Sequence, residues 1–377
     1  MWTERAPAPT PALGEPRAGG LTILHLTHQG GGAGSTVSIA ALAAAQRAAG
    51  HRVLVGCRAG TLLAAMAHEA GVDVVPLAFD RCADLARQIV RVVKETGVDV
   101  VNSHASRDRA ACRLARLSGR LPSACVMTRR QMPRSLPVSV LLNGFVADCT
   151  IAVSRAVARA LARRGAPLWR VRVVPNGVDL ARIDRHVSGA AIETARVLAG
   201  WRPWRPTVGV VARRKDHDVL LRSLAALEQP LTLTLLGVEP DAELLALAAA
   251  APRHTVRCVP FRPDVLAFYR VFDAVVLPSR SEGLSQALLE AMALGLPVVA
   301  SRAGGNVDLV SHGDDGLLVA PRDPTAFADA LARLLGDVGL RRRLGEQARR
   351  TSRERFSMQR TAALTDRAYR IALARRR

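Results

Sequence analysis

The stretch DAVVLPSRSEGLSQALLEAMALGLPVVAS (residues 273–301) contains the signals of two strands separated by a loop and a helix. The apolar run 273–278 predicts a buried strand, SRSEG predicts a loop, and a helix is expected to start near Leu284. The run 297–301 predicts the next strand. A helix between two buried strands is typical of a parallel sheet that is covered by helices.

The same alternation extends outward over most of the chain. Further apolar runs predict strands, at 21–27, 52–56, 72–76, 98–103, 123–128, 148–153, 171–174, 207–212, 231–236 and 255–259. Helical patterns of 10–15 residues separate many of them. We therefore expect an α/β protein with two doubly wound units of parallel strands. Ligands of such units bind at the carboxyl ends of the strands, so the site is expected in the cleft between the units.

Length and local composition predict the domain boundaries. A chain of 377 residues favours two domains over one core. The predicted segments are a disordered, Pro- and Gly-rich tail, a first unit, an irregular linker that contains WRPWRP, a second unit, and a C-terminal helix that packs back on the first unit: 1–20, 21–180, 181–206, 207–355 and 356–377. The start of the chain has no apolar signal-peptide region, and no apolar run reaches the length of a membrane span, so we expect a cytoplasmic protein.

The net charge of +21 indicates an acidic partner. Nucleic acid fits poorly as that partner, because the charge is scattered and the basic residues do not alternate with aromatic ones. A basic face that rests on an anionic membrane surface, or a phosphorylated substrate, fits better. The six cysteines form no CxxC pair and are expected to be reduced core residues rather than zinc ligands.

The loop HQGGGAGS (28–35) follows the first predicted strand. It is not a GxGxxG dinucleotide motif, because Ser35 and Val37 stand where that motif needs glycine. We interpret Gly30–Gly34 as a turn that lets a ligand approach the backbone. A plain strand-to-helix turn remains the alternative.

Two glutamates, Glu282 and Glu290, are separated by seven uncharged residues. Glu290 lies in an apolar helix, where a buried carboxylate needs a partner. The ribose hydroxyls of a nucleotide would satisfy Glu290, and a sugar would satisfy Glu282. The free N–H groups of Gly283, Leu284 and Ser285 at the helix start would bind the phosphate between them. In the alternative interpretation, Glu282 is a first-turn acid and Glu290 is one half of a salt bridge.

The segment ARRKDH (212–217) follows a strand of the second unit and is expected to face the same cleft. Arg213 or Arg214, together with Lys215, could neutralise a diphosphate. A solvated charge cluster is the alternative. Asp216 is expected to be the N-cap of the next helix rather than a metal ligand.

These motifs resemble those of bacterial glycosyltransferases of family 4, which have the GT-B architecture of two facing Rossmann-like domains. The resemblance covers nearly the whole chain after residue 20. It is carried by SEGLSQALLEAMALGLPVVASRAGGNVDLV (281–310), VPNGVDL (174–180), VARRKDHDVLL (211–221) and AVSRAVARAL (152–161).

The resemblance implies roles for individual residues. Glu290 would hold the nucleotide ribose, Glu282 would contact the donor sugar, and His104 would lie near the transferred sugar. The basic pair would bind the diphosphate, although the two charges of that pair are usually several residues apart. The matching motifs add three residues to the donor site, namely Asn176, Gly304 and Gly305. The acceptor side is expected to include Gly31, Gly32, Arg107, Arg129 and Arg130.

The implied activity is transfer of a sugar from a nucleotide-diphosphate donor to a hydroxyl acceptor with retention of configuration, without metal or cofactor. The implied acceptor is a glycan or glycolipid, of the cell envelope or lipopolysaccharide type, handled at the inner face of the cytoplasmic membrane. The competing interpretations are a nucleotide-sugar epimerase of similar fold, which would need no acceptor, and a non-catalytic nucleotide-sugar binding protein.

Overall fold

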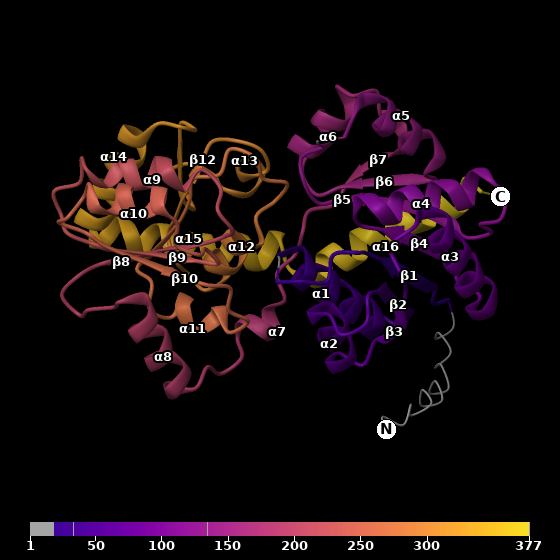
Figure 1. The fold of residues 1–377 in the computed structure, drawn as a ribbon, viewed down its shortest axis with the longest axis horizontal. Helices are drawn as coiled ribbons and strands as arrows, with labels where there is room; N and C mark the ends of the chain where they lie inside the picture. Colours follow the sequence, from indigo (N-terminus) through magenta and orange to yellow (C-terminus); the bar gives the residue numbers. More distant parts are fainter. Residues whose placement is uncertain (1–18, 33, 134, 377) are drawn as a thin grey trace.

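The computed structural model describes residues 19–32, 34–133 and 135–376, which form two α/β domains (Figure 1). The predicted tail, 1–20, falls almost wholly outside the described residues. The two predicted α/β units are confirmed, and each is built around its own parallel sheet. Among the described residues, no helix combines the length and the apolar character that crossing a membrane requires.

The first domain contains a seven-stranded parallel sheet of order β3-β2-β1-β4-β5-β6-β7. Its strands are β1 Thr22–Leu26, β2 Arg52–Cys57, β3 Asp73–Pro76, β4 Val100–Ser103, β5 Ala124–Arg129, β6 Cys149–Ala152 and β7 Val171–Val173. Its helices are α1 Gly34–Ala48, α2 Leu62–Glu69, α3 Cys82–Thr96, α4 Ser106–Leu117, α5 Pro137–Val146, α6 Arg155–Ala162 and the 3₁₀ turn η1 Leu168–Arg170. All five residues of β1 are buried, as expected for a central strand with helices on both faces.

The second domain contains a six-stranded parallel sheet of order β10-β9-β8-β11-β12-β13. Its strands are β8 Thr207–Val211, β9 Thr232–Leu236, β10 Thr255–Val259, β11 Ala274–Leu277, β12 Val298–Ser301 and β13 Leu317–Val319. The helices from the domain junction onward are α7 Leu180–Ile183, α8 Gly189–Ala199, α9 His217–Leu224, α10 Ala242–Ala249, α11 Val265–Tyr269, α12 Gln286–Ala293, α13 Asn306–Leu309, α14 Pro324–Gly336, α15 Val338–Arg355 and α16 Met358–Ala374.

The segment 181–206, expected to be an irregular linker, is largely helical. Helix α8 occupies Gly189–Ala199, capped by the Ser188 hydroxyl at its start and by left-handed Gly200 at its end. It packs against β9, β10 and α11 of the second domain. The apolar residues of α8 bury against that sheet, so this segment belongs to the second domain rather than lying between the two. Helices α4 and α5 were also not predicted.

The C-terminal helix α16 crosses from the second domain to the first and packs on α1, β5 and β6 (Figure 1). The hydroxyl of its buried Tyr369 accepts a hydrogen bond from Asn102 Nδ2 at 2.7 Å. The Asp366 carboxylate accepts hydrogen bonds from the amide of Gln46 at 2.8 Å and contacts the ring of His51 at 2.9 Å. These contacts tie the last helix to the first sheet.

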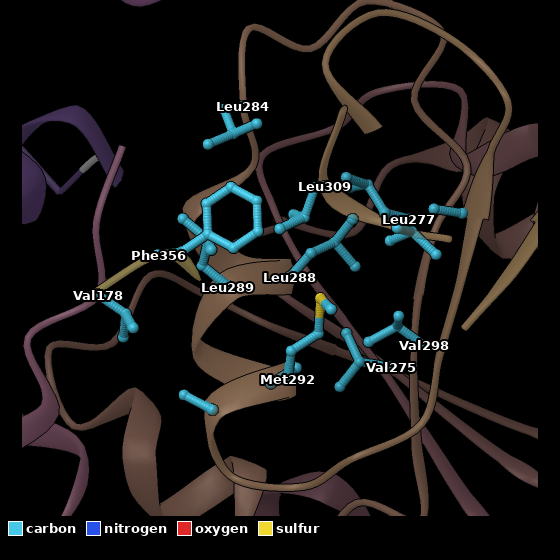
Figure 2. Close-up of a cluster of buried hydrophobic side chains, with 14 of the residues drawn as sticks. Val178, Val275, Leu277, Leu284, Leu288, Leu289, Met292, Val298, Leu309 and Phe356 are labelled. Atoms are coloured by element: carbon cyan, nitrogen blue, oxygen red, sulfur yellow. The ribbon is translucent and has the colours of Figure 1, made fainter. Parts of the chain in front are cut away.

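Helix α12 is anchored by apolar side chains on most of its surface (Figure 2). Leu288, Leu289 and Met292 are fully buried against β11, β12 and Phe356. The Ser285 hydroxyl caps the helix by accepting a hydrogen bond from the Leu288 N–H at 3.3 Å. This anchoring fixes the direction in which Glu290, a polar residue of the same helix, points.

Candidate active site

A cleft of about 1040 Å³ separates the two domains. Its walls come from the carboxyl ends of strands in both sheets, as the doubly wound fold predicts. The loop after β1 and the residues after β5 line one wall, and the residues after β8 and β11 line the other. The described lining includes both glutamates of the motif, Glu282 and Glu290.

Glu290 is 4% exposed, and its partner is Arg182 of the short helix α7. Arg182 Nη1 lies 2.8 Å from Glu290 Oε1. The Asp179 carboxylate caps α7 and so positions Arg182. The alternative interpretation of Glu290 as a salt-bridge member therefore holds in this structure. Both side chains still line the cleft, so the pair presents polar atoms to a ligand there.

Glu282 lies in the loop between β11 and α12 and binds Lys215 from the opposite loop. Lys215 Nζ is 2.7 Å from Glu282 Oε1. The Lys215 side chain is 38% exposed and that of Glu282 12%, so the carboxylate is the more buried partner. Both line the cleft. The loop that contains Lys215 and the loop that contains Glu282 thus lie close together, as predicted, and their two charges form an ion pair.

Arg213 and Arg214 point in different directions. Arg213 lines the cleft, whereas Arg214 is held outside it by the carboxylates of Asp241 and Glu243. Only Arg213 is therefore positioned to meet a ligand. Asp216 occupies the N-cap position of α9 but makes no capping bond. Its backbone is left-handed, and its carboxylate instead accepts a hydrogen bond from the Arg280 N–H at 3.0 Å.

The glycines of the donor motif serve close packing. A side chain at Gly283 would lie 2.0 Å from the carbonyl oxygen of Arg130, in the opposite domain. One at Gly305 would lie 1.7 Å from the Gly283 carbonyl, and Gly304 combines a φ of +54° with a 2.5 Å approach to the Glu282 carbonyl. None of the three lines the cleft. In this structure the three glycines allow the Glu282 loop and the first domain to approach closely. Their direct contact with the donor stays a prediction.

Leu284 and Ser285 do line the cleft, but their polar groups are partly committed. The Leu284 carbonyl accepts a hydrogen bond from Asn176 Nδ2 at 3.2 Å, and the Ser285 hydroxyl caps α12. Asn176 also accepts from Arg130 Nη1 at 2.8 Å. Asn176 therefore links an arginine of the first domain to the helix start of the second.

Arg130 is the cation of the first domain that reaches the cleft. Its guanidinium donates to Ser38 Oγ at 2.7 Å and contacts His104 Nδ1 at 3.2 Å. Among the described residues no carboxylate pairs with it. Burial lowers the pKa of Arg130 to about 10, which still leaves it charged at neutral pH. An unpaired, largely buried cation that faces a cleft favours an anionic ligand.

His104 does not line the cleft, contrary to the expected position beside the transferred sugar. It is 5% exposed, and its Nε2 lies 2.9 Å from His25 Nδ1 while Arg130 contacts the other nitrogen. Burial lowers the pKa of His104 well below 6.5, and burial lowers that of His25 to about 4. Both rings are therefore neutral near pH 7, and His104 supports Arg130 from beneath.

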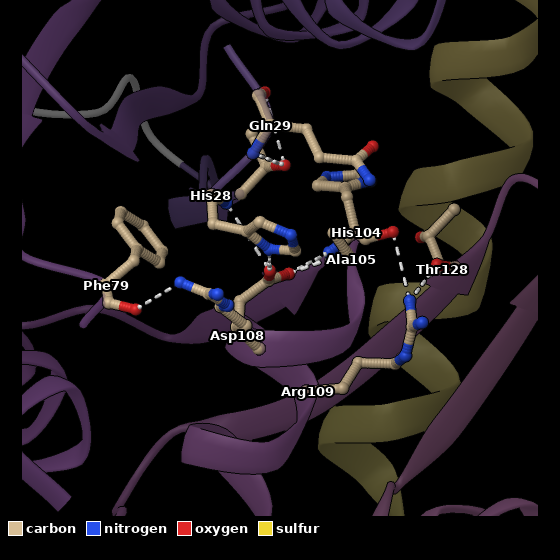
Figure 3. A network of polar contacts seen from close by, with 10 residues as sticks. His28, Gln29, Phe79, His104, Ala105, Asp108, Arg109 and Thr128 are labelled. Atoms are coloured by element: carbon tan, nitrogen blue, oxygen red, sulfur yellow. Dashed lines mark hydrogen bonds and ion pairs between the residues drawn. The ribbon is translucent and has the colours of Figure 1, made fainter. Parts of the chain in front are cut away.

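His28, which the sequence analysis did not single out, lies at the cleft surface. Figure 3 shows its contact with Asp108. His28 follows β1 directly and lines the cleft, and its Nδ1 lies 3.0 Å from the buried Asp108 Oδ1. Asp108 also accepts hydrogen bonds from the N–H groups of His104 and Ala105, at 2.7 and 2.6 Å. The sequence contained a signal for Asp108, because an acid at the third position of a helix commonly accepts hydrogen bonds from the N–H groups at the helix start.

The remaining acceptor-side residues divide. Gly31 and Gly32 line the cleft, and Gly32 packs closely on Phe261 of the second domain. Arg107 instead donates to the Phe79 carbonyl at 3.2 Å, away from the cleft. Arg129 is 5% exposed and borders a separate small cavity beneath α5. Adjacent residues of an extended strand point to opposite faces, so Arg129 and Arg130 could not both face the cleft.

Two α/β domains, each with a parallel sheet, that face each other across a polar cleft define the GT-B class of fold. The comparisons with solved structures agree. A glycosyltransferase from Rickettsia africae superposes with a TM-score of 0.78 at 19% identity, covering 94% of this chain and 99% of that one. Anabaena Alr3699/HepE in complex with UDP-glucose gives 0.77 at 21% identity, covering 92% and 98%.

Sequence comparisons identify the family. Residues 32–182 match the model described as Glycosyltransferase Family 4, and residues 205–337 match Glycosyl transferases group 1. The chain belongs to glycosyltransferase family 4.

Two relatives, from Paenarthrobacter aurescens and Xylanimonas cellulosilytica, are both named D-inositol 3-phosphate glycosyltransferase. They are 35% and 37% identical over 226 and 245 residues, which is 56% and 61% of this chain and 54% and 58% of theirs. The chain thus matches little more than half the length of these curated relatives.

Proposed function

We propose that this protein transfers a sugar from a nucleotide-diphosphate donor to a hydroxyl acceptor, with retention of configuration at the transferred carbon. The observation that carries the proposal is one cleft whose lining includes the cations Arg130, Arg213 and Lys215 together with the carboxylates of the glutamate motif. A diphosphate leaving group needs positive charge, and sugar and ribose hydroxyls need acceptors. The cleft offers both within its lining.

In this proposal the second domain holds the donor. Glu290 accepts hydrogen bonds from the ribose, and its contact with Arg182 holds the carboxylate in position. Arg213 and Lys215 bind the diphosphate and stabilise the charge that develops on it as the glycosidic bond breaks. Glu282 accepts from a hydroxyl of the donor sugar while its other oxygen keeps Lys215 in place.

Neither carboxylate is proposed as a nucleophile. Glu282 and Glu290 are each held by a cation at less than 3 Å, which lowers their nucleophilicity and suits them to accept hydrogen bonds. The acceptor hydroxyl therefore attacks the anomeric carbon from the face that the diphosphate leaves. Its proton passes to the departing phosphate oxygen, which gains charge in the same step.

The donor is proposed to be a uridine nucleotide sugar, because the Anabaena neighbour of the same fold is described in complex with UDP-glucose. The acceptor is proposed to be a hydroxyl of a cell-envelope glycolipid or polysaccharide. The names of the sequence relatives make D-inositol 3-phosphate the competing acceptor. Arg130 and His28 supply the positive and polar groups on the acceptor wall in either case.

A thermal-shift series with UDP, GDP, ADP and CMP tests the donor site. Stabilisation is about 2.7 kcal/mol at 100 times the dissociation constant. We expect UDP to stabilise the protein and Glu290→Gln to remove that effect. Arg214→Gln is the matched control, because Arg214 lies outside the cleft, and it should respond to UDP like the wild type. If no nucleotide stabilises the wild type, the proposed donor site is refuted.

Incubation with UDP-glucose then separates transfer from epimerisation. Transfer requires an acceptor, so with UDP-glucose alone we expect no epimerised nucleotide sugar. Adding a glycolipid extract or D-inositol 3-phosphate should release UDP and yield an α-linked product. Epimerised donor in the absence of acceptor would contradict the proposal.

A further inference from the structure

Helix α5 of the first domain exposes an apolar stripe. Val138, Leu141, Leu142 and Phe145 are 65%, 39%, 46% and 51% exposed, and their spacing of three and four residues puts them on one face. The opposite face, which includes Val140 and Gly144, packs into the domain. An exposed stripe of this kind on a helix is unusual for a surface that meets only water.

The stripe continues onto the neighbouring 3₁₀ turn η1. Trp169 is 61% exposed, and its ring lies 6.2 Å from the ring of Phe145 in an edge-to-face arrangement. Leu136, just before α5, is 77% exposed. We name the α5 apolar face as Leu136, Val138, Leu141, Leu142, Phe145 and Trp169. In Figure 1, α5 lies at the outer edge of the first domain, on the side away from α1 and α2.

The segment of the chain that contains this face is strongly basic. Residues 109–178 contain 13 arginines and a single acidic residue, Asp148. Asp148 is already bound by Arg116 at 2.7 Å, so it presents little free negative charge. More than half of the net charge of +21 therefore arises from this 70-residue segment.

Four arginines are attached directly to α5 and η1. Arg113 donates to Asn143 Oδ1 at 2.9 Å, and Arg170 donates to the Ala147 carbonyl at 2.8 Å. The Trp169 carbonyl accepts hydrogen bonds from Arg172 at 3.0 Å and from Arg375 at 2.6 Å.

Within the part of the chain that the structure describes, none of these four arginines forms an ion pair. We call them the arginine rim: Arg113, Arg170, Arg172 and Arg375.

We propose that the α5 apolar face and the arginine rim dock on an anionic membrane surface. Aromatic and aliphatic side chains on one helix face enter the headgroup boundary, while surrounding arginines bind lipid phosphates. A second copy of this chain fits less well, because a symmetric contact through this face would bring the two arginine rims together without acidic partners.

Docking at α5 would place the cleft close to the membrane. Arg130 and Gln131 line the cleft, and α5 begins only six residues later, at Pro137. An acceptor carried by a lipid could thus reach the first-domain wall without leaving the bilayer. The docking surface does not depend on the proposed transferase activity, because it uses none of the groups assigned to donor binding or chemistry.

Sedimentation of the full chain with phosphatidylcholine vesicles, with and without phosphatidylglycerol, tests the proposal. We expect binding to the anionic vesicles, weakening as salt rises but not vanishing. The double variant Leu142→Ser/Phe145→Ser should bind at least tenfold more weakly. Trp204→Ser is the matched control, since Trp204 is 76% exposed in the second domain, and it should bind like the wild type.

The charge contribution has its own variant. Arg172→Gln keeps a donor for the Trp169 carbonyl but removes one rim charge, so binding to anionic vesicles should fall about fivefold. Arg222→Gln, at an exposed arginine of α9, should not change it. Melting temperatures and the UDP response of all variants should match the wild type, which separates failure of docking from failure of the donor site.

Absence of vesicle binding by the wild type would overturn the proposal. Unchanged binding by Leu142→Ser/Phe145→Ser would overturn it as well. A third result would also overturn it: light scattering shows a wild-type dimer that does not bind vesicles, and the double variant is a monomer. A second copy of the chain would then occupy the α5 apolar face.

Discussion

Replacing Arg182 by methionine should destabilise the second domain by leaving Glu290 without its cation. The side chains are 18% and 6% exposed, and their atoms lie 2.8 Å apart. Removing one partner of a fully buried pair costs about 3–5 kcal/mol, whereas exposed pairs contribute about 0–1. Since the pair borders the open cleft, water can reach the orphaned carboxylate, and we expect a loss of about 2 kcal/mol.

A double-mutant cycle isolates this interaction. Glu290→Gln removes the charge that Arg182 compensates, so Arg182→Met should cost much less in the Glu290→Gln background, with a coupling energy of about 1–2 kcal/mol. Scanning calorimetry of the four proteins measures it. For a domain of 150–250 residues, about 2 kcal/mol corresponds to a decrease in Tm of about 4–8 °C.

The reasoning fails if Arg182→Met lowers stability by less than about 0.5 kcal/mol, the range of exposed pairs. It also fails if the two substitutions are additive, because Glu290 would then be stabilised by something other than Arg182. Methionine is chosen because it keeps most of the packing of the arginine stem against α12.

Three further outcomes follow from the structure. Lys215→Ala should lower kcat by at least tenfold with little change in Tm, while Arg214→Ala leaves kcat near the wild-type value; steady-state kinetics checks both. Because burial lowers the pKa of His25 to about 4, below the unfolded value of about 6.5, the unfolded state binds more protons between these values. Stability should therefore fall by about 3 kcal/mol as pH decreases from 6.5 to 4, and urea titrations of His25→Gln should show a shallower fall. Gly283→Ala should weaken the UDP-induced thermal shift, because its Cβ would meet the Arg130 carbonyl at 2.0 Å and push the domains apart; an unchanged shift would contradict this.

Much of the fold was predictable because the signals are local. The period and length of apolar runs located every strand of the two sheets except β13, and the predicted strand 255–259 agrees with β10 Thr255–Val259. Helix α8 was missed because the WRPWRP motif (201–206), which follows it, suggested an irregular segment. Tertiary packing on β9 and β10 stabilises that helix, and no local pattern reports such packing.

The site divides in the same way. The spacing of Glu282 and Glu290 around a helix start was sufficient to predict one shared cleft. The sequence could not predict whether Arg213 or Arg214 faces the cleft, because adjacent side chains point in different directions. The ion pair with Asp241 shows that Arg214 is the one held outside the cleft. Arg182 was missed because it lies 108 residues before Glu290, and nothing in its own surroundings marks it as a partner.

Local sequence signals were enough to predict the two parallel α/β units, the basic character of the chain and the residue types available to the cleft. Which of those residues meet depends on the tertiary structure. It buried His104 behind Arg130, brought His28 to the surface beside Asp108, and turned Arg129 away from the cleft. The physical reason is that secondary structure depends on neighbours within a few residues, whereas the pairing and burial of charges depend on contacts between elements that are distant in the chain.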